Sequence, residues 1–462
     1  MPVSSSRSRA GAATRREFLR RTGLLGAAAL GGSALVSSCA DQGGTVARPS
    51  GAASSAGPSE GLTRPLALHH DAALGPAFEP YVADFNQRYP YELTTSYVPQ
   101  DYFGITQTQL AGGSIDYDVL FSGAGYVQTW YDAGWARALD DLEGADEILD
   151  ALLPGLEASL RAPDGALVAL PYYVGVELFC YNEAHVERAG GIPPETWDAF
   201  VDMCRRLKAD GVTDTPYSPF WTAEFDMIQV EFAAEAFSDG AGPLFGEQFE
   251  PLFASDPVYA RTLERWQLLY AEGLVPEDIF TTAYGDASNI FAGGQSTFTL
   301  RYGPQLKGWR DPEQSQVSDV ARNALIPGET HTSRSFMERW MMTSSTPSPE
   351  ASWDLLRYLA YKDLDGEFHV PSNLVSIDLG LQTPYATVND DPAVRESWNE
   401  WSDAELLAAQ VSNSRGTGPA EDQPWYQEFV ADFVPILQDV ARGVKSVDQG
   451  LEEGADLVEA NL

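Results

Sequence analysis

The sequence is poor in the residues that build metal sites and disulfide frameworks. Among 462 residues it has three cysteines, Cys39, Cys180 and Cys204, whose spacing fits neither a disulfide framework nor a metal-ligand pattern. Its five histidines are never four residues apart, which excludes the usual zinc-binding helix. We therefore expect neither a metal ion nor a cofactor.

Motifs of enzymes are also missing. There is no G-x-S-x-G turn for a nucleophile and no G-K-[ST] phosphate loop, and Gly443–Ser446 lacks the spacing of the latter. Acidic residues are plentiful enough for a secreted glycosidase, which needs two carboxylates facing one cleft, but no pair stands out. The sequence predicts a binding protein, with a secreted carbohydrate-active enzyme as the weaker alternative.

Basic residues are scarce. The chain has 29 Lys and Arg against 67 Asp and Glu, a net charge of −38, and beyond residue 38 the balance is 23 against 66. Such a body repels nucleic acid and anionic lipid, so we expect no nucleic-acid partner. The charge favours a neutral or cationic ligand over an anionic one.

No apolar run is long enough to remain as a membrane span. The longest near the N-terminus, Leu24–Val36, has 13 residues. It follows the twin arginines Arg15 and Arg16 and ends in Val36-Ser37-Ser38-Cys39, an aliphatic residue, two small residues and a cysteine. This order predicts a twin-arginine lipoprotein signal peptide over 1–38 and a lipid on Cys39, which would anchor the protein on the outer face of the cytoplasmic membrane.

Residues 39–61, rich in Gly, Ala and Ser, read as a flexible tether. The N-terminus resembles the signal of proteins that the twin-arginine route exports already folded. Folding would then occur in a reducing compartment, where disulfides are rare. We therefore expect Cys180 and Cys204 to be buried apolar residues rather than a bridge.

The body has the length for two lobes and alternates strands with helices. Strands are predicted at 66–70, 93–98 and 117–121, and the apolar spacing from Phe78 to Tyr89 predicts a helix between the first two. This alternation favours α/β layers with mostly parallel sheets, in which ligands bind beyond the carboxyl ends of the strands.

Helix boundaries can also be predicted. Thr196 and Ser348 are expected N-caps, the second followed by Pro349 at the first helical position. Ser446-Val447-Asp448-Gln449 is a capping-box pattern. Pro435 interrupts an apolar helical pattern, which predicts a kink or a boundary there.

Several stretches resemble the extracellular solute-binding proteins of sugar-type ABC importers, of which maltose-binding protein is the best-known member. The most specific stretch runs from Leu170-Pro171-Tyr172-Tyr173 to Tyr181-Asn182 and on through Ala189–Asp198. Others are Tyr117–Leu142, Phe291–Gln295 with Gly303-Pro304, and Ser345–Trp353. The resemblance covers residues 64–462, with Gln305 at a place where the family frequently has Trp.

The resemblance implies an α/β, periplasmic-binding-protein-like (type II) clamp of two lobes with a ligand cleft between them. The N-terminal lobe would hold 62–171 and 329–370, and the C-terminal lobe 177–324 and 376–462. Hinges would lie near Tyr172, Ile326-Pro327 and Pro371. The partners implied are a small solute and the permease subunits of an importer, with the chain itself a monomer.

Candidate ligand-binding residues are those that the family turns toward its cleft or that follow a predicted strand. Either ligand contact or core packing is open at Tyr172, Trp221 and Trp340, and Tyr172 is preferred over its neighbour Tyr173. The full set is His70, Asp71, Ser122, Tyr126, Tyr172, Trp221, Tyr302, Arg339, Trp340, Arg415 and Trp425. Aromatic rings and polar groups together suit a carbohydrate, and a polyamine or another non-sugar solute is the alternative.

Overall fold

The first sheet contains the strands that were predicted at the start of the body. The computed structural model describes residues 62–462 except 73, 100, 114, 124 and 225–226, all within the second of the two units into which the chain divides, 56–462. The sheet order is β2-β1-β3-β8-β4, with β9 pairing to β8. Its strands are β1 (Leu66–Asp71), β2 (Leu93–Val98), β3 (Val119–Ser122), β4 (Leu170–Val176), β8 (Ser333–Met342) and β9 (Ser414–Arg415).

The second sheet has the order β6-β5-β7 and is antiparallel throughout. Its strands are β5 (Leu178–Asn182), β6 (Phe298–Arg301) and β7 (Ala321–Ala324). In the first sheet β1 pairs in parallel with β2 and β3, but β8 runs antiparallel to both β3 and β4. The expectation of mostly parallel sheets is therefore wrong, because parallel pairing is confined to the segment 66–122 and the short β8–β9 pair.

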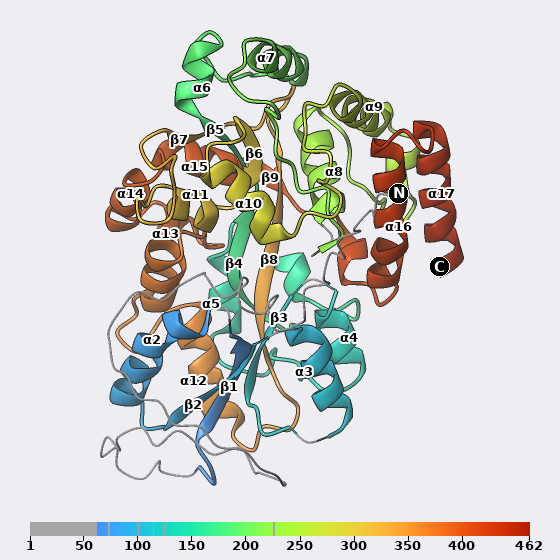
Figure 1. The fold of residues 1–462 in the computed structure, drawn as a ribbon. Coiled ribbons are helices and arrows are strands. Elements are labelled where there is room, and N and C mark those ends of the chain that lie inside the picture. Colours follow the sequence, from blue (N-terminus) through green and yellow to red (C-terminus); the bar gives the residue numbers. More distant parts are fainter. Residues whose placement is uncertain (1–61, 73, 100, 114, 124, 225–226) are drawn as a thin grey trace, which may run out of the picture. The chain divides into compact units, whose positions relative to one another are not determined.

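Helices cover both sheets (Figure 1). Those before β5 are α2 (Gly75–Arg88), α3 (Tyr102–Ala111), α4 (Val127–Asp132) and α5 (Ala145–Asp150). Between β5 and β8 lie α6 (Glu183–Arg188), α7 (Trp197–Ala209), α8 (Met227–Ser238), α9 (Pro257–Ala271), α10 (Tyr284–Ala292) and α11 (Gly303–Trp309). After β8 come α12 (Pro349–Ala360), the π-helix Pro371–Asp378, α13 (Ala386–Asn389), α14 (Pro392–Asn399), α15 (Ala404–Ser412), α16 (Tyr426–Ala441) and α17 (Val447–Asn461).

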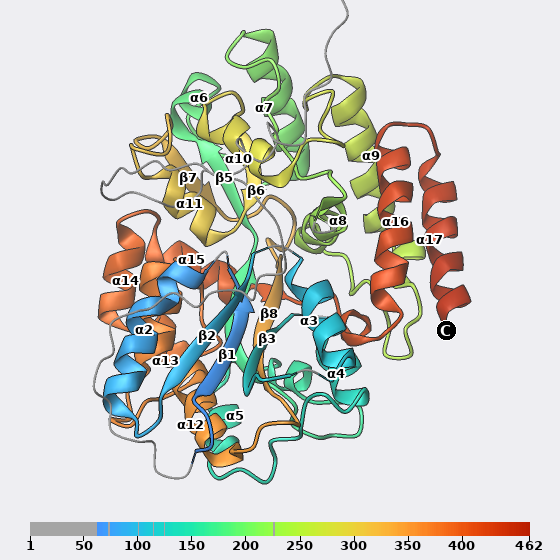
Figure 2. The ribbon, with the colours of Figure 1, turned by 60° about the horizontal axis from the view of Figure 1, so that its bottom comes forward.

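Strands β4 and β8 form an antiparallel ribbon that extends beyond the ends of β1 and β3, as both views show (Figures 1 and 2). Strand β4 ends at Val176, and β5 begins at Leu178 in the other sheet, with one residue between them. The chain thus passes from one sheet to the other at Glu177. Two large apolar clusters form, one built mainly on the first sheet and one on β5, β6 and the helices α7, α8, α9 and α16.

Local signals explain several helix starts. The Thr196 hydroxyl accepts from the Ala199 N–H at the start of α7, and Ser446 and Gln449 form the predicted capping box of α17. Ser348 precedes α12 as predicted, but its side chain makes no capping bond. Its hydroxyl is not needed there, because Pro349 already removes one of the free N–H groups of the first turn.

Pro435 lies inside α16 and does not end it, so of the two alternatives, a kink or a boundary, the boundary is wrong and the kink stays a prediction. The helix continues because Phe429, Phe433 and Leu437 are buried against the second apolar cluster. Packing of this face compensates for the backbone hydrogen bond that a proline cannot donate. Cys180 and Cys204 are buried and free, as predicted.

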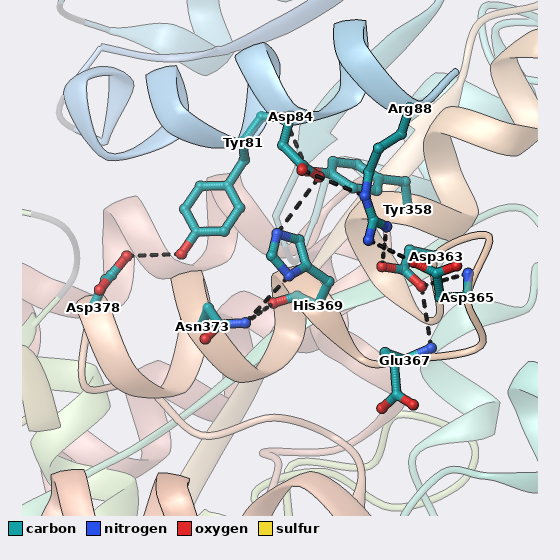
Figure 3. Close-up of polar contacts among 10 residues, drawn as sticks. All are labelled: Tyr81, Asp84, Arg88, Tyr358, Asp363, Asp365, Glu367, His369, Asn373 and Asp378. Atoms are coloured by element: carbon teal, nitrogen blue, oxygen red, sulfur yellow. Dashed lines mark hydrogen bonds and ion pairs between the residues drawn. The ribbon is translucent and has the colours of Figure 1, made fainter. Parts of the chain in front are cut away.

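A polar network ties α2 to the segment that follows α12 (Figure 3). Arg88 pairs with Asp363, with Asp365 at 2.7 Å and with Asp84 at 3.4 Å. Burial alone would raise the pKa of Asp363, but the Glu367 N–H, the Arg88 guanidinium and the Asp365 N–H hold that pKa below its ordinary value. Asp363 is therefore a buried carboxylate whose charge is stabilised by Arg88 together with two backbone N–H groups.

The same network reaches the π-helix Pro371–Asp378. The Tyr81 hydroxyl donates to Asp378 at 2.8 Å, and the Tyr358 hydroxyl donates to Asp84 at 2.9 Å (Figure 3). His369 Nε2 lies 3.6 Å from Asp84, and the Asn373 amide donates to the His369 carbonyl at 2.9 Å. Helix α2 therefore holds the chain in place where it leaves α12.

We expect Arg88→Met to lower the free energy of unfolding by about 1–3 kcal/mol at pH 7, because it leaves the Asp363 carboxylate buried without its cation. The difference from the wild type should shrink as the pH falls below about 4, where Asp363 becomes protonated in the unfolded chain. Denaturant titrations of the wild type and Arg88→Met at pH 7 and at a pH below about 4 measure this difference in unfolding free energy.

Arg205→Met is the matched control, since it breaks an exposed pair with Glu272 whose side chains are 41% and 38% exposed. Its cost should stay within about 1 kcal/mol. An equal loss in the two variants would contradict the structural role of Arg88.

Candidate functional site

Strands β1 and β3 end side by side at Asp71 and Ser122, next to the β4–β8 ribbon. Beyond the carboxyl ends of such strands the sheet leaves space for a ligand. In the ribbon, Tyr173 is paired with Glu338 and Gly175 with Phe336, so these side chains share one face. Phe336 lies over Gly175, where an added Cβ would come within 2.2 Å of the ring.

Three more rings join this face from the other sheet and its helices. Tyr302 packs edge-on against Phe336 with ring centroids 5.4 Å apart, and Tyr173 lies 6.1 Å from Phe336. Tyr284 stacks on Phe220 at 4.3 Å, and the Arg301 guanidinium lies against the Phe220 ring. We name the five rings Tyr173, Phe220, Tyr284, Tyr302 and Phe336 the aromatic face.

Hydrogen bonds fix the rings of the aromatic face. The Tyr302 hydroxyl donates to Glu177 Oε1 at 2.7 Å, and the Gln305 amide donates to the Tyr284 hydroxyl at 3.0 Å. Burial raises the pKa of Glu177 to about 7, although Arg334 at 3.8 Å acts against this. The second oxygen of Glu177 has no hydrogen-bond partner among the described residues.

Glu338 is the other carboxyl group on this face. Its Oε2 lies 2.9 Å from where a Cβ of Gly123 would stand, which places it at the carboxyl end of β3. This atom is buried and has no hydrogen-bond partner in the described part of the chain. Burial raises the pKa of Glu338 to about 8, against the effect of Arg339 and Arg334.

The segment before α16 closes the site from the opposite side. Arg334 Nη2 donates to Glu421 at 3.0 Å, and Arg339 Nη2 lies 3.4 Å from Asp422. The Gly125 N–H donates to the same Asp422 carboxylate at 3.4 Å. Charged pairs thus join β8 and the β3–α4 turn to residues 421–422.

The reverse face of the ribbon lines a groove of about 700 Å³. Val174, Ser335 and Met337 point into it, since they alternate with Tyr173, Phe336 and Glu338. Residues 155–165 and 416–423 form much of the remaining wall. Phe336, a ring of the aromatic face, also lines this groove, so the face and the groove meet at that residue.

Several predicted site residues are packed in the core. Tyr172, Trp340 and His70 are at most 1% exposed and pack on one another, with ring centroids 4.6 to 5.9 Å apart. Burial lowers the pKa of His70 to about 4. Alternation along β4 does separate two tyrosines, but the ring that stays partly exposed is Tyr173 rather than Tyr172.

Two further aromatic candidates have other neighbours. Trp221 is fully buried and packs against Trp266 and Phe280. Of the two alternatives predicted for this residue, ligand contact and core packing, the structure shows core packing. Trp425 is partly exposed and meets Phe245 and Phe249 edge-on. Neither ring belongs to the aromatic face.

The remaining candidates are spread around the strand ends. Ser122 is paired in register with Arg339, and Tyr126 stacks on Phe103 at 4.3 Å. Arg415 donates to the carbonyls of Ala241 and Gly242 and covers the Phe237 ring. Of the predicted set, Asp71, Ser122, Tyr302 and Arg339 are brought to the edge of the site.

Sequence reasoning missed most of the aromatic face and both of its carboxyl groups. The available signal was a lone acidic residue within an apolar run, as at Glu177, whereas the strand of Glu338 also contains Arg334 and Arg339 and gave no such signal. Within the described ranges no group of three His, Cys, Asp or Glu could hold a metal ion, and no helix there is long and apolar enough to cross a membrane.

Comparison with known proteins agrees with this architecture. The profile of a family described as bacterial extracellular solute-binding protein matches residues 80–396. The chain belongs to this family. MalE3 of T. maritima, solved with maltose bound, superposes with a TM-score of 0.72 at 19% identity, covering 86% of this chain and 99% of that one. The two-lobe α/β fold predicted from the sequence is confirmed.

Curated members of the solute-binding proteins match over shorter stretches. An erythritol/L-threitol-binding protein of Mycolicibacterium smegmatis is 26% identical over 211 residues, 41% of this chain and 44% of that protein. The sn-glycerol-3-phosphate-binding protein UgpB of Brucella abortus is 31% identical over 86 residues, 18% of this chain and 19% of that protein. The chain thus matches less than half the length of these relatives.

The raised pKa of Glu177 gives a pH-dependent prediction. A carboxyl group whose pKa is raised on folding contributes stability below its ordinary pKa near 4.5, which is lost as the pH rises through about 7. From pH 5 to pH 8 the wild type should therefore lose about 2 kcal/mol more unfolding free energy than Glu177→Gln. Denaturant titrations at the two pH values measure this difference.

Glu187→Gln, at an exposed position of α6, is the control and should follow the wild type. If Glu177→Gln also followed the wild type, Glu177 would not be the buried acid that the structure describes.

Proposed function

We propose that this chain is the solute-capturing component of an ABC importer and binds a small sugar or polyol at the aromatic face. The observation that carries the proposal is the aromatic face, four of whose five rings are partly exposed, together with the buried free oxygens of Glu177 and Glu338, the latter beside Gly123 after β3. The captured solute would be delivered to membrane permease subunits. We propose binding without chemical turnover.

A sugar or polyol suits the aromatic face for a physical reason. Its C–H groups pack on aromatic rings, while its hydroxyl groups need acceptors such as the free oxygens of Glu177 and Glu338. A hydroxyl missing from a wrong solute would leave one of these buried acceptors unpaired, which costs about 1–3 kcal/mol. Three relatives whose names mention maltose, erythritol or threitol, and glycerol 3-phosphate support a polyhydroxylated solute.

Movement of two lobes would open and close this site. We propose the lobes at 62–171 with 329–370 and at 177–324 with 376–462. In support, the chain changes sheets at Glu177, and the π-helix Pro371–Asp378 lies between α12 and the later helices. The charged pairs of Arg334 and Arg339 with residues 421–422 would then form on closure.

The ligand class is tested by a thermal-shift screen of sugars and polyols, since a ligand that binds only the folded protein raises its melting temperature. For the best ligand found, Tyr173→Ala should weaken binding ten- to hundredfold in calorimetry, about 1–3 kcal/mol.

Tyr91→Ala is the matched control, because Tyr91 precedes β2 at the opposite end of the sheet. It should leave affinity unchanged. If Tyr173→Ala bound the sugar as tightly as the wild type, the aromatic face would not be its site. A screen without any sugar or polyol hit would contradict the ligand class.

We also propose the export route predicted from the N-terminus: recognition of Arg15-Arg16, removal of residues 1–38 and lipidation of Cys39. These residues lie outside the described part of the structure, and the proposal rests on their sequence. The membership of an extracellular solute-binding family supports it. The lipid would hold the body on the outer face of the cytoplasmic membrane.

In a bacterium that processes lipoproteins, Cys39→Ala should abolish labelling by radioactive palmitate and release the protein from the membrane fraction or leave it unprocessed. Ser38→Ala keeps a small residue before the cysteine and should be labelled like the wild type. A labelled, membrane-bound Cys39→Ala protein would disprove lipidation at this residue.

A further inference from the structure

Glu338 is partly exposed but has one buried carboxyl oxygen, Oε2, without a partner. In the described part of the chain it forms no ion pair, and its Oε2 accepts no hydrogen bond. It lies beside Gly123 at the end of β3, where a ligand would enter. Leaving a carboxylate buried without a partner is unfavourable, so a site that retains one is suited to a ligand that supplies the missing charge.

The cations near Glu338 are committed to other carboxylates. Arg334 pairs with Glu421 at 3.0 Å and lies 3.8 Å from Glu177, while Arg339 pairs with Asp422. Two guanidinium groups thus face four carboxyl groups, counting Glu338. Neither guanidinium group pairs with Glu338, so this carboxyl group is left to a ligand that brings its own cation.

Aromatic residues are neighbours of Glu338 on the same face of the ribbon. Tyr173 is its register partner across the ribbon, Phe336 is two residues away on the same face, and Tyr302 packs on Phe336. The faces of aromatic rings attract cations, most strongly where water is excluded. A carboxylate among rings is a site for a protonated amine, whereas hydroxyl groups alone need only acceptors.

We propose that the solute carries a protonated amine beside its hydroxyl groups, as in an amino sugar or an amino polyol, and that Glu338 with the aromatic face binds this amine. The inference rests on the proposed function, since it assigns the ligand to the same site. The free oxygen of Glu177 then accepts from a hydroxyl group. The pKa of Glu338, which burial raises, agrees with a carboxyl group that has no cation paired to it.

Matched pairs of compounds test the proposal. Each amine is measured beside its neutral counterpart by calorimetry: glucosamine and glucose, galactosamine and galactose, mannosamine and mannose, 1-amino-1-deoxysorbitol and sorbitol, and 2-amino-1,3-propanediol and glycerol. The tightest binder should be an amine, at least tenfold tighter than its counterpart. N-acetylation, which removes the charge, should abolish the preference.

Glu338→Gln should weaken the amine at least tenfold and change its neutral counterpart less than threefold. Glu338→Asp keeps the charge and should lose less of the preference than Glu338→Gln. Glu92→Gln, at an exposed position before β2, should change neither affinity. Melting temperatures without ligand establish that each variant is folded, and removal of an unpaired buried charge should not lower that of Glu338→Gln.

The outcomes separate this inference from the proposed function. A neutral sugar or polyol that binds more tightly than its amine overturns the inference and leaves the function standing, as does a sugar phosphate found as the tightest ligand. An amine preference that survives Glu338→Gln overturns the role of Glu338. The absence of binding by every sugar, polyol and amine in both the screen and these pairs overturns both proposals.

Discussion

The antiparallel pairing of β4 with β8 is the constraint on which the site depends. Through β8 the ribbon is joined to β3 and so to the first sheet, and through β4 it leads directly into β5 of the second. Backbone hydrogen bonds fix its register, so Tyr173, Phe336 and Glu338 come to one face and Val174, Ser335 and Met337 to the other. Rings from the second sheet and its helices can therefore meet residues at the ends of the first.

The ribbon also brings together an unusual number of buried charges. Arg334, Glu177 and Glu421 lie within one linked group, and Arg339 faces Asp422. Burying ions costs several kcal/mol for each unless they are paired well, so this arrangement contributes little to stability by itself. It does fix which segments can approach each other at the site, and it leaves Glu338 as the acid without a cation.

Much of the fold could be predicted because its signals are local. The strand at Leu93–Val98, the Thr196 cap and the Ser446 capping box depend on neighbours within a few residues, and the structure has each of them. The antiparallel pairing of β8 joins segments more than 150 residues apart, and no local pattern encodes it. Pro435 shows the same limit, since distant packing carries a helix through it.

The site was harder to predict for a related reason. Large aromatic residues serve cores and ligand sites alike, and only burial distinguishes Trp221 and Tyr172 from the partly exposed Tyr173 and Tyr284. The resemblance to known solute-binding proteins located the region but not the individual rings. A lone glutamate in an apolar run, as at Glu177, was the better signal. Burying an acid costs free energy unless it is paired, whereas burying an aromatic ring is favourable.

Phe336 lying over Gly175 has a consequence for how this sequence can diverge. A methyl group at position 175 would overlap the ring, so any larger residue there requires a smaller one at 336. The two positions are 161 residues apart in sequence yet share one volume. In related chains the two positions should therefore change together, with a larger side chain at 175 wherever 336 is smaller. Each such exchange would change the shape of the proposed solute site.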